Sequence, residues 1–158
     1  MGGGDIGDPV DIRGWLRLSP RFTTSGRLHA EDLPRLAALG VRHVVNLALD
    51  NHPEALAGEA EKLRASGIAY THIPVPFDAP TDEHYRQFVT AIEDMECPAH
   101  VHCIMNYRVS AFFYRWHRSC GMPEPEARRL MEKIWSPHDS DRPDVKPWRA
   151  FVERAGQE

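Results

Sequence analysis

The sequence has no apolar run that approaches the ~20 residues of a membrane-spanning helix. Its opening residues, Met1 to Ile6, lack the basic start and the apolar stretch of a secretion signal. It contains only three cysteines, Cys97, Cys103 and Cys120, and no Cys-x-x-Cys pair, so neither a disulfide framework nor a structural zinc site is indicated. We therefore expect a cytoplasmic protein with no membrane partner.

Charge and histidine placement exclude further classes of partner. The formal net charge is -4, and the basic residues are spread along the chain, so no stripe exists that would neutralise a nucleic-acid backbone. Nine histidines are present, but none forms a His-x-x-x-His pair on a helix, so no metal site is predicted. We expect no nucleic-acid partner, no metal and no cofactor, and no pattern indicates an oligomeric state.

The length of 158 residues suits one domain with a single core. We assign residues 1–14 to a flexible N-terminal segment and residues 15–158 to one domain. Strand and helix patterns alternate along this domain. Strands are expected at residues 15–18, 41–49, 69–75 and 100–102. Helices are expected at residues 30–39, 54–66, 81–95, 109–120 and 124–134, with a short last helix containing Trp148 and Phe151.

Helical crossovers between successive strands require parallel pairing and right-handed connections. The segment between the first strand and the first helix, which contains Ser25 and Gly26, is expected to be a loop. The pattern therefore predicts an α/β fold with a mainly parallel four-stranded sheet, flanked by helices on both faces.

The most informative stretch leads from a buried strand through Cys103 into a helix. Backbone N-H groups in such a loop and at the helix N-terminus point the same way, and with the helix dipole they form an anion site. A helix N-terminus and a neighbouring arginine also favour the thiolate form of a cysteine, which is the nucleophilic form. Cys103 is therefore a candidate for covalent catalysis on a bound anion.

Other residues of the stretch suit the same chemistry. Arg108 supplies a planar fork that can bind two oxygens of a phosphoryl group. Asn106 falls where a tight loop needs a positive φ, which asparagine tolerates better than most residues. Ser110 is placed to donate a hydrogen bond to the thiolate. The predicted anion-binding set consists of His102, Ile104, Met105, Asn106, Tyr107, Val109 and Ser110, with Arg108.

A His-Cys pair followed by a short loop, an arginine and a serine resembles the signature of the cysteine-dependent protein tyrosine phosphatase superfamily. Residues 16–20, residues 24–26 and residues 40–47 are also similar to small bacterial members of its dual-specificity branch. The resemblance spans roughly residues 15–135. It implies a dual-specificity-phosphatase-like fold and a metal-independent phosphomonoester hydrolase with a phosphorylated protein or small molecule as substrate.

The resemblance also implies roles for individual residues. Cys103 would attack phosphorus to form a phosphocysteine, Arg108 and the loop amides would hold the phosphoryl oxygens, and His102 would orient the loop. An aspartic acid would protonate the leaving group. Asp78 is our candidate, because Asp82 and Glu83 are sufficiently explained as first-turn residues that stabilise a helix N-terminus.

Two alternatives arise from the spacing of the loop. The superfamily pattern is Cys-x5-Arg, whereas four residues separate Cys103 from Arg108 here. Cys-x4-Arg is the spacing of rhodanese sulfurtransferases, whose loop cysteine carries a persulfide, although those loops place a hydroxyl residue directly after the arginine and Val109 follows here. A rhodanese-like sulfurtransferase and a catalytically weak phosphate-binding module therefore stand beside the phosphatase.

Overall fold

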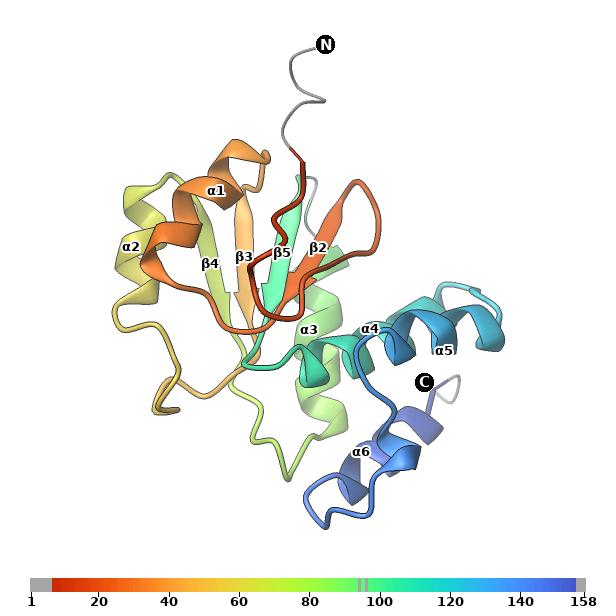
Figure 1. The fold of residues 1–158 in the computed structure, drawn as a ribbon. Helices are drawn as coiled ribbons and strands as arrows, with labels where there is room; N and C mark the ends of the chain where they lie inside the picture. The colour runs from red at the N-terminus through yellow and green to blue at the C-terminus, as the bar shows by residue number, and fades with distance from the viewer. Residues whose placement is uncertain (1–6, 94, 96, 156–158) are drawn as a thin grey trace.

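In the computed structural model, which describes residues 7–93, 95 and 97–155, a central sheet is covered by helices on both faces (Figure 1). Its strand order is β1-β2-β5-β3-β4. The strands are β1 (Leu16–Arg17), β2 (Phe22–Ser25), β3 (His43–Asn46), β4 (Ala69–His72) and β5 (Ala99–His102). All neighbouring pairs are parallel except β1 with β2, which is antiparallel at the edge. The predicted α/β fold with a mainly parallel sheet is confirmed.

The helices follow the predicted order with shifted ends. They are η2 (Ala30–Asp32), α1 (Leu33–Ala38), α2 (Glu59–Ala65), α3 (Asp82–Glu93), α4 (Tyr107–Ser119), α5 (Glu124–Glu132), η3 (Pro137–Asp139) and α6 (Lys146–Glu153). Thr81 caps α3, because its Oγ1 accepts the backbone N-H of His84 at 3.1 Å. The fourth helix starts earlier than expected, at Tyr107 rather than Val109.

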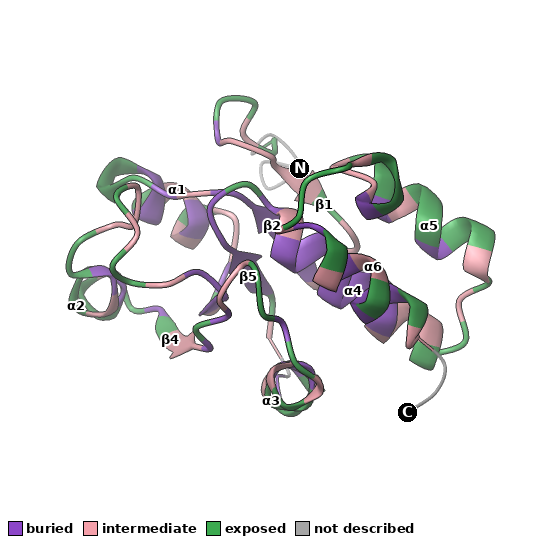
Figure 2. Cartoon of the chain, turned by 90° about the horizontal axis from the view of Figure 1, so that it is seen from below, coloured by how far each residue is buried: buried purple, intermediate pink, exposed green. Residues whose placement is uncertain are grey.

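Two hydrophobic clusters lie on opposite faces of the sheet. Helices α1 and α2 cover the smaller cluster, and α3, α4, α5 and α6 cover the larger one (Figures 1 and 2). Successive residues of a strand point to opposite faces, so Val44 joins the smaller cluster and Val45 the larger. Both are completely buried. This double coverage explains why the central strands read as continuous apolar runs.

The prediction of four strands was wrong, because β2 is a fifth strand in the segment predicted to be a loop. It pairs with β1 and with β5. Its Thr23 and Ser25 are buried and bond His100 of β5, with Oγ1 to Nδ1 at 2.9 Å and Oγ to Nε2 at 2.8 Å. Phe22 is the one apolar residue among the four buried residues of β2, so the strand shows no apolar alternation and the usual strand signal was missing.

The N-terminal part that the structure describes lies against the smaller cluster. Ile12 is 5% exposed and packs there, and Arg13 binds Glu54 through two hydrogen bonds of 3.1 Å. Within the described ranges, which end at residue 155, no helix is long and apolar enough to cross a membrane. The domain boundary at residue 15 remains a prediction.

Candidate functional site

Cys103 directly follows the central strand β5 and lies at the start of the loop that leads into α4. Its backbone N-H bonds the carbonyl of Ser25 on β2 at 3.3 Å, which extends the β2 to β5 pairing by one residue. Its side chain is completely buried. The sheet therefore fixes the backbone of Cys103, and its side chain packs in the larger cluster.

The loop and the first turn of α4 present a run of backbone N-H groups. Among the described residues, no acceptor bonds the amides of residues 104–109, and the first helical bond of this region runs from Ser110 N-H to the carbonyl of Asn106. The first amides of any helix lack intrahelical partners. Such groups bind anions, particularly with a helix dipole behind them.

Asn106 gives the loop its turn. Its φ is +70°, and it is the non-glycine residue with positive φ within the described part of the chain, as the sequence predicted. Its Nδ2 donates to the carbonyl of Gly14 at 2.7 Å and to Oγ1 of Thr24 at 3.0 Å. These two bonds explain why the position is asparagine, because glycine would allow the same backbone but could not tie the loop to the N-terminal segment.

Gly26 lies directly against the other side of the loop. A methyl group at its Cα position would stand 2.4 Å from the carbonyl oxygen of Ile104, which is well inside van der Waals contact. That same carbonyl accepts the backbone N-H of Arg27 at 2.9 Å. Because Gly26 has no side chain, the loop can pack closely against the segment after β2.

Arg108 is the second residue of α4 and reaches the segment that follows β4. Its Nε donates to the carbonyl of Val75 at 2.8 Å, and its guanidinium carbon lies 5.3 Å from the ring centre of Phe77. The residue is 6% exposed. Its two Nη groups have no hydrogen-bond partner within the residues that the structure describes. One edge of the guanidinium is therefore anchored, and the other can bind an anion.

A pocket of about 250 Å³ opens at this place. It is lined by His52, Phe77, Ile104, Met105, Tyr107, Arg108 and Arg142. Four of these residues, Ile104, Met105, Tyr107 and Arg108, belong to the predicted set, whereas His102, Cys103 and Asn106 do not line the pocket. The sequence did not indicate the other three, because they come from segments that lie far from the loop along the chain.

His102 forms a buried pair with Glu59, which the sequence analysis missed. Nε2 of His102 lies 2.6 Å from Oε2 of Glu59, and both side chains are about 5% exposed, at 4% and 6%. The other ring nitrogen, Nδ1, lies 3.2 Å from the carbonyl oxygen of Cys103. Glu59 is the first residue of α2 and is anchored further by Nδ2 of Asn46 at 3.4 Å. The pair links α2 to the backbone of the candidate nucleophile.

The neighbouring His100 has a structural role. Both ring nitrogens are bonded to the hydroxyls of β2, and the ring of Trp15 stacks on it at 5.0 Å. Burial lowers the pKa of His100 well below its usual value, and the nearby His102 acts in the same direction. His100 is therefore a neutral, fully bonded core residue rather than a ligand.

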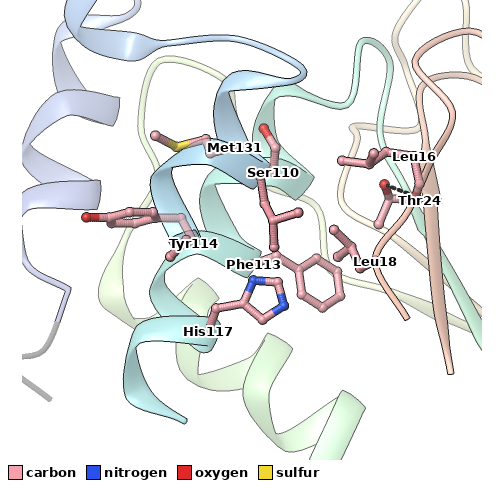
Figure 3. Close-up of a pocket in the computed structure, with 10 residues that line it drawn as sticks. Leu16, Leu18, Thr24, Ser110, Phe113, Tyr114, His117 and Met131 are labelled. Atoms are coloured by element: carbon pink, nitrogen blue, oxygen red, sulfur yellow. Dashed lines mark hydrogen bonds between the residues drawn. The ribbon is translucent and has the colours of Figure 1, made fainter. Parts of the chain in front are cut away.

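Val109 and Ser110 were predicted to bind the substrate, but they do not line the pocket. Val109 is completely buried in the larger cluster. Ser110 lies in a separate small cavity among Leu16, Thr24 and Met131, and its Oγ donates to the carbonyl of Tyr107 at 3.1 Å (Figure 3). Residues two apart in a helix point roughly 200° apart, so Ser110 is directed away from the face that carries Arg108.

Asp78 lies beside the pocket but does not line it. It is exposed in the turn after β4, where the backbone N-H of Ala79 bonds the carbonyl of Pro76 at 3.1 Å. The preceding residue, Phe77, contacts the guanidinium of Arg108 through its ring and Trp148 through its carbonyl, which accepts Nε1-H at 2.5 Å. The start of this turn is therefore held in place at Phe77, and Asp78 lies exposed at its tip.

The other acidic candidates are held in ion pairs. Asp82 accepts bonds from Nη1 of Arg115 at 3.0 Å and from Nε of Arg154 at 2.9 Å, and these partners, Arg115 first, lower the pKa of Asp82. Glu83 pairs with Arg86 at 2.9 Å, which likewise lowers the pKa of Glu83. A carboxyl group with a lowered pKa is a poor proton donor near neutral pH.

Comparison with known proteins identifies the family. The family model of the beta-lactamase hydrolase-like protein, phosphatase-like domain, matches residues 14–117. The chain belongs to this phosphatase-like family. The match includes the loop from Cys103 to Arg108 and all five strands of the sheet.

A curated relative carries the same family name. The beta-lactamase hydrolase-like protein of Agrobacterium fabrum is 29% identical over 91 residues, which cover 56% of this chain and 21% of that protein. The chain thus matches about a fifth of that relative's length.

Solved structures share the fold of this phosphatase-like chain. A DUF442 protein from Shewanella putrefaciens CN-32 is 26% identical, with 93% of each chain covered and a TM-score of 0.80. TpbA of P. aeruginosa, crystallised with phosphotyrosine, is 19% identical, with 90% and 85% covered and a TM-score of 0.68. The core catalytic domain of the PP-IP phosphatase SIW14 from S. cerevisiae is 11% identical, with 96% and 90% covered and a TM-score of 0.74.

The close approach at Gly26 gives the first prediction. Gly26→Ala should displace the Ile104 carbonyl and with it the loop amides, so we expect turnover of an aryl phosphate to fall by about 10-fold to 100-fold. Gly67→Ala is the matched control, because an added Cβ there meets nothing within 4 Å while its positive φ costs about 1 kcal/mol. Steady-state kinetics and urea unfolding are measured on both variants. Equal losses of activity in both would contradict a specific contact at Gly26.

The buried pair with His102 gives the second prediction. Glu59→Gln leaves a neutral amide in place of the carboxylate, so we expect the free energy of unfolding to fall by about 1–3 kcal/mol. We also expect weaker binding of inorganic phosphate, because the pair holds the Cys103 backbone. Glu61→Gln, on the exposed side of the same helix, is the control. Urea unfolding and calorimetric titration test this, and the idea fails if the two variants behave alike.

Proposed function

We propose that this protein is a metal-independent phosphomonoester hydrolase that works through a phosphocysteine intermediate on Cys103. The observation that carries the proposal is the run of amides at residues 104–109, directly after Cys103, that bond no acceptor among the described residues. Loop residues and Arg108, whose Nη groups bond no described residue either, line one pocket. Membership of a phosphatase-like family and the phosphatases among the structural neighbours support the same reaction.

In the proposed first step, the phosphoryl group binds to the loop amides and to both Nη groups of Arg108. The thiolate of Cys103 then forms a bond to phosphorus as the bond from phosphorus to the ester oxygen breaks. The leaving oxygen takes a proton from the carboxyl group of Asp78. The positive ends of the amides and the arginine offset the negative charge that is spread over the phosphoryl oxygens during transfer.

In the second step, water attacks the phosphocysteine. The new bond from oxygen to phosphorus replaces the bond from sulfur to phosphorus, the thiolate is regenerated and inorganic phosphate leaves. The carboxylate of Asp78 accepts the proton of the attacking water, which restores the acid for the next cycle. His102 and Glu59 act behind the loop, where they hold the carbonyl of Cys103 in place.

The substrate in this proposal carries a phosphate monoester. TpbA, a structural neighbour, was crystallised with phosphotyrosine, and SIW14 is named a PP-IP phosphatase. Phosphotyrosine carries a phosphoryl group, and SIW14 is named for a phosphatase activity. These neighbours support a phosphorylated substrate in general. The residues that line the pocket select the part of the substrate that carries the phosphate.

The decisive experiment is the hydrolysis of para-nitrophenyl phosphate in the presence of a chelator. We expect the wild-type protein to release phosphate and Cys103→Ser to release none. Arg108→Lys should lose about 100-fold or more, because an ammonium group cannot bind two phosphoryl oxygens as a planar fork does. Cys120→Ser, at an exposed cysteine outside the site, is the control. Thiocyanate formation from thiosulfate and cyanide without phosphate release would instead establish a sulfurtransferase.

The role of Asp78 is tested through the leaving group. Asp78→Asn should slow hydrolysis of an alkyl phosphate by about 10² to 10⁴-fold but that of para-nitrophenyl phosphate far less, since nitrophenolate leaves without protonation. Glu83→Gln removes a nearby carboxylate that is already paired with Arg86, and we expect it to change neither rate. A loss of the same size on both substrates would exclude Asp78 as the general acid.

A further inference from the structure

The pocket beside the Cys103 loop is lined by more basic than acidic residues. Of the residues that line it, three are basic, namely His52, Arg108 and Arg142, and none is acidic. One arginine is sufficient to hold one phosphoryl group, because the loop amides provide the remaining donors. The two other basic groups therefore have no function in the proposed reaction on a simple monoester.

His52 is held so that it presents a donor. Its Nδ1 accepts the backbone N-H of Glu54 at 3.0 Å, so Nε2 is the ring nitrogen that carries a proton. The turn is fixed further by the bond from Ala55 N-H to the His52 carbonyl at 3.0 Å. Arg13 and Arg27 both bind the carboxylate of Glu54, which anchors this segment beside the loop. The imidazole is thus presented by a fixed turn rather than by a free surface segment.

Arg142 comes from the irregular segment between η3 and α6. Asp144 holds one edge of its guanidinium, with Nε to Oδ1 at 3.0 Å and Nη2 to Oδ2 at 2.6 Å. This geometry leaves Nη1 outside the pair. The segment itself is tied to α6, because Arg149 donates to the carbonyls of Pro137 and Ser140. Arg142 is therefore oriented, although its side chain remains 64% exposed.

We propose that His52 and Arg142 form a second anion subsite at the mouth of the pocket. It selects small phosphate esters that carry a second anionic group, and it rests on the proposed function at Cys103. The reacting phosphoryl group occupies the loop and Arg108, the apolar walls of Phe77 and Tyr107 contact the carbon skeleton, and the second group binds Nε2 of His52 and Nη1 of Arg142.

The size of the pocket agrees with this assignment. Its volume of about 250 Å³ is below the usual range of ~300–1,000 Å³ for small-molecule sites. A compact molecule can fill such a space with its phosphoryl group at the loop. Its second anionic group then lies close to the mouth of the pocket. Asp144 offsets only part of the charge at Arg142, because it binds one edge of the guanidinium.

The test compares three matched substrates with one scissile group each: phenyl phosphate, 4-carboxyphenyl phosphate and 4-(phosphonomethyl)phenyl phosphate. We expect kcat/KM for the phosphonate to exceed that for phenyl phosphate by about tenfold, with the carboxylate between them. In Arg142→Ala and His52→Ala, the ratio of phosphonate to phenyl phosphate should fall at least threefold. Arg86→Ala, which removes a basic side chain on the outer face of α3, should leave the ratio unchanged.

Binding to Cys103→Ser separates this inference from the proposed reaction. If no substrate is hydrolysed by the wild-type protein, the proposed function fails, and calorimetric titration of the same three compounds still reports on the subsite. Tighter binding of the phosphonate that is lost in Cys103→Ser/Arg142→Ala supports the subsite. Equal affinity for all three compounds, or an equal loss in Cys103→Ser/Arg86→Ala, overturns it. A preference for the carboxylate over the phosphonate would show that the second anionic group recognised by the subsite is a carboxylate.

Discussion

The left-handed turn at Asn106 is the constraint on which the site depends. A loop between a strand and a helix turns its amides toward one point only if one residue adopts a positive φ. That conformation is costly for a residue with a side chain, and the hydrogen bonds of Asn106 to the Gly14 carbonyl and to Thr24 offset the cost. The N-terminal segment and β2 therefore support the candidate site through Asn106, although their residues do not line the pocket.

The position of Arg108 follows from where α4 begins. Because the helix starts at Tyr107, Arg108 is in the first turn and its side chain reaches the carbonyl of Val75 in the segment after β4. The next residue, Val109, turns about 100° away and enters the larger core cluster. The spacing of four residues thus places the arginine on the pocket side of the helix and an apolar residue on the core side. A hydroxyl residue directly after the arginine would be buried in that core.

Short-range patterns in the sequence predict the conformation of the Cys103 loop but not the distant residues that surround it. The positive φ of Asn106 and the position of Cys103 between a strand and a helix could be predicted, because each depends on residues only a few positions away. Glu59 could not, since its partner His102 is 43 positions away and only the fold brings them together. The same reason applies to His52 and Arg142.

Strand β2 escaped prediction for a different reason. All four of its residues are buried, and three of them, Thr23, Thr24 and Ser25, carry hydroxyl groups. Thr23 and Ser25 bond both nitrogens of His100. Hydrophobic alternation detects burial by apolar contact and does not detect burial by hydrogen bonding. The missing strand lies between β1 and β5, so the sequence analysis also missed the element that carries Ser25 to the Cys103 amide.

The turn that carries Asp78 depends on a part of the chain outside the family match. The matched region ends at residue 117, whereas Trp148 of α6 donates to the Phe77 carbonyl and Trp135 stacks on Tyr107 at 4.5 Å. Phe77 in turn lies against the guanidinium of Arg108. The C-terminal part of the chain therefore holds the start of this turn, at Phe77, close to the Cys103 loop. The family match therefore includes the Cys103 loop and the turn with Asp78, but not the residues of the C-terminal part that hold this turn.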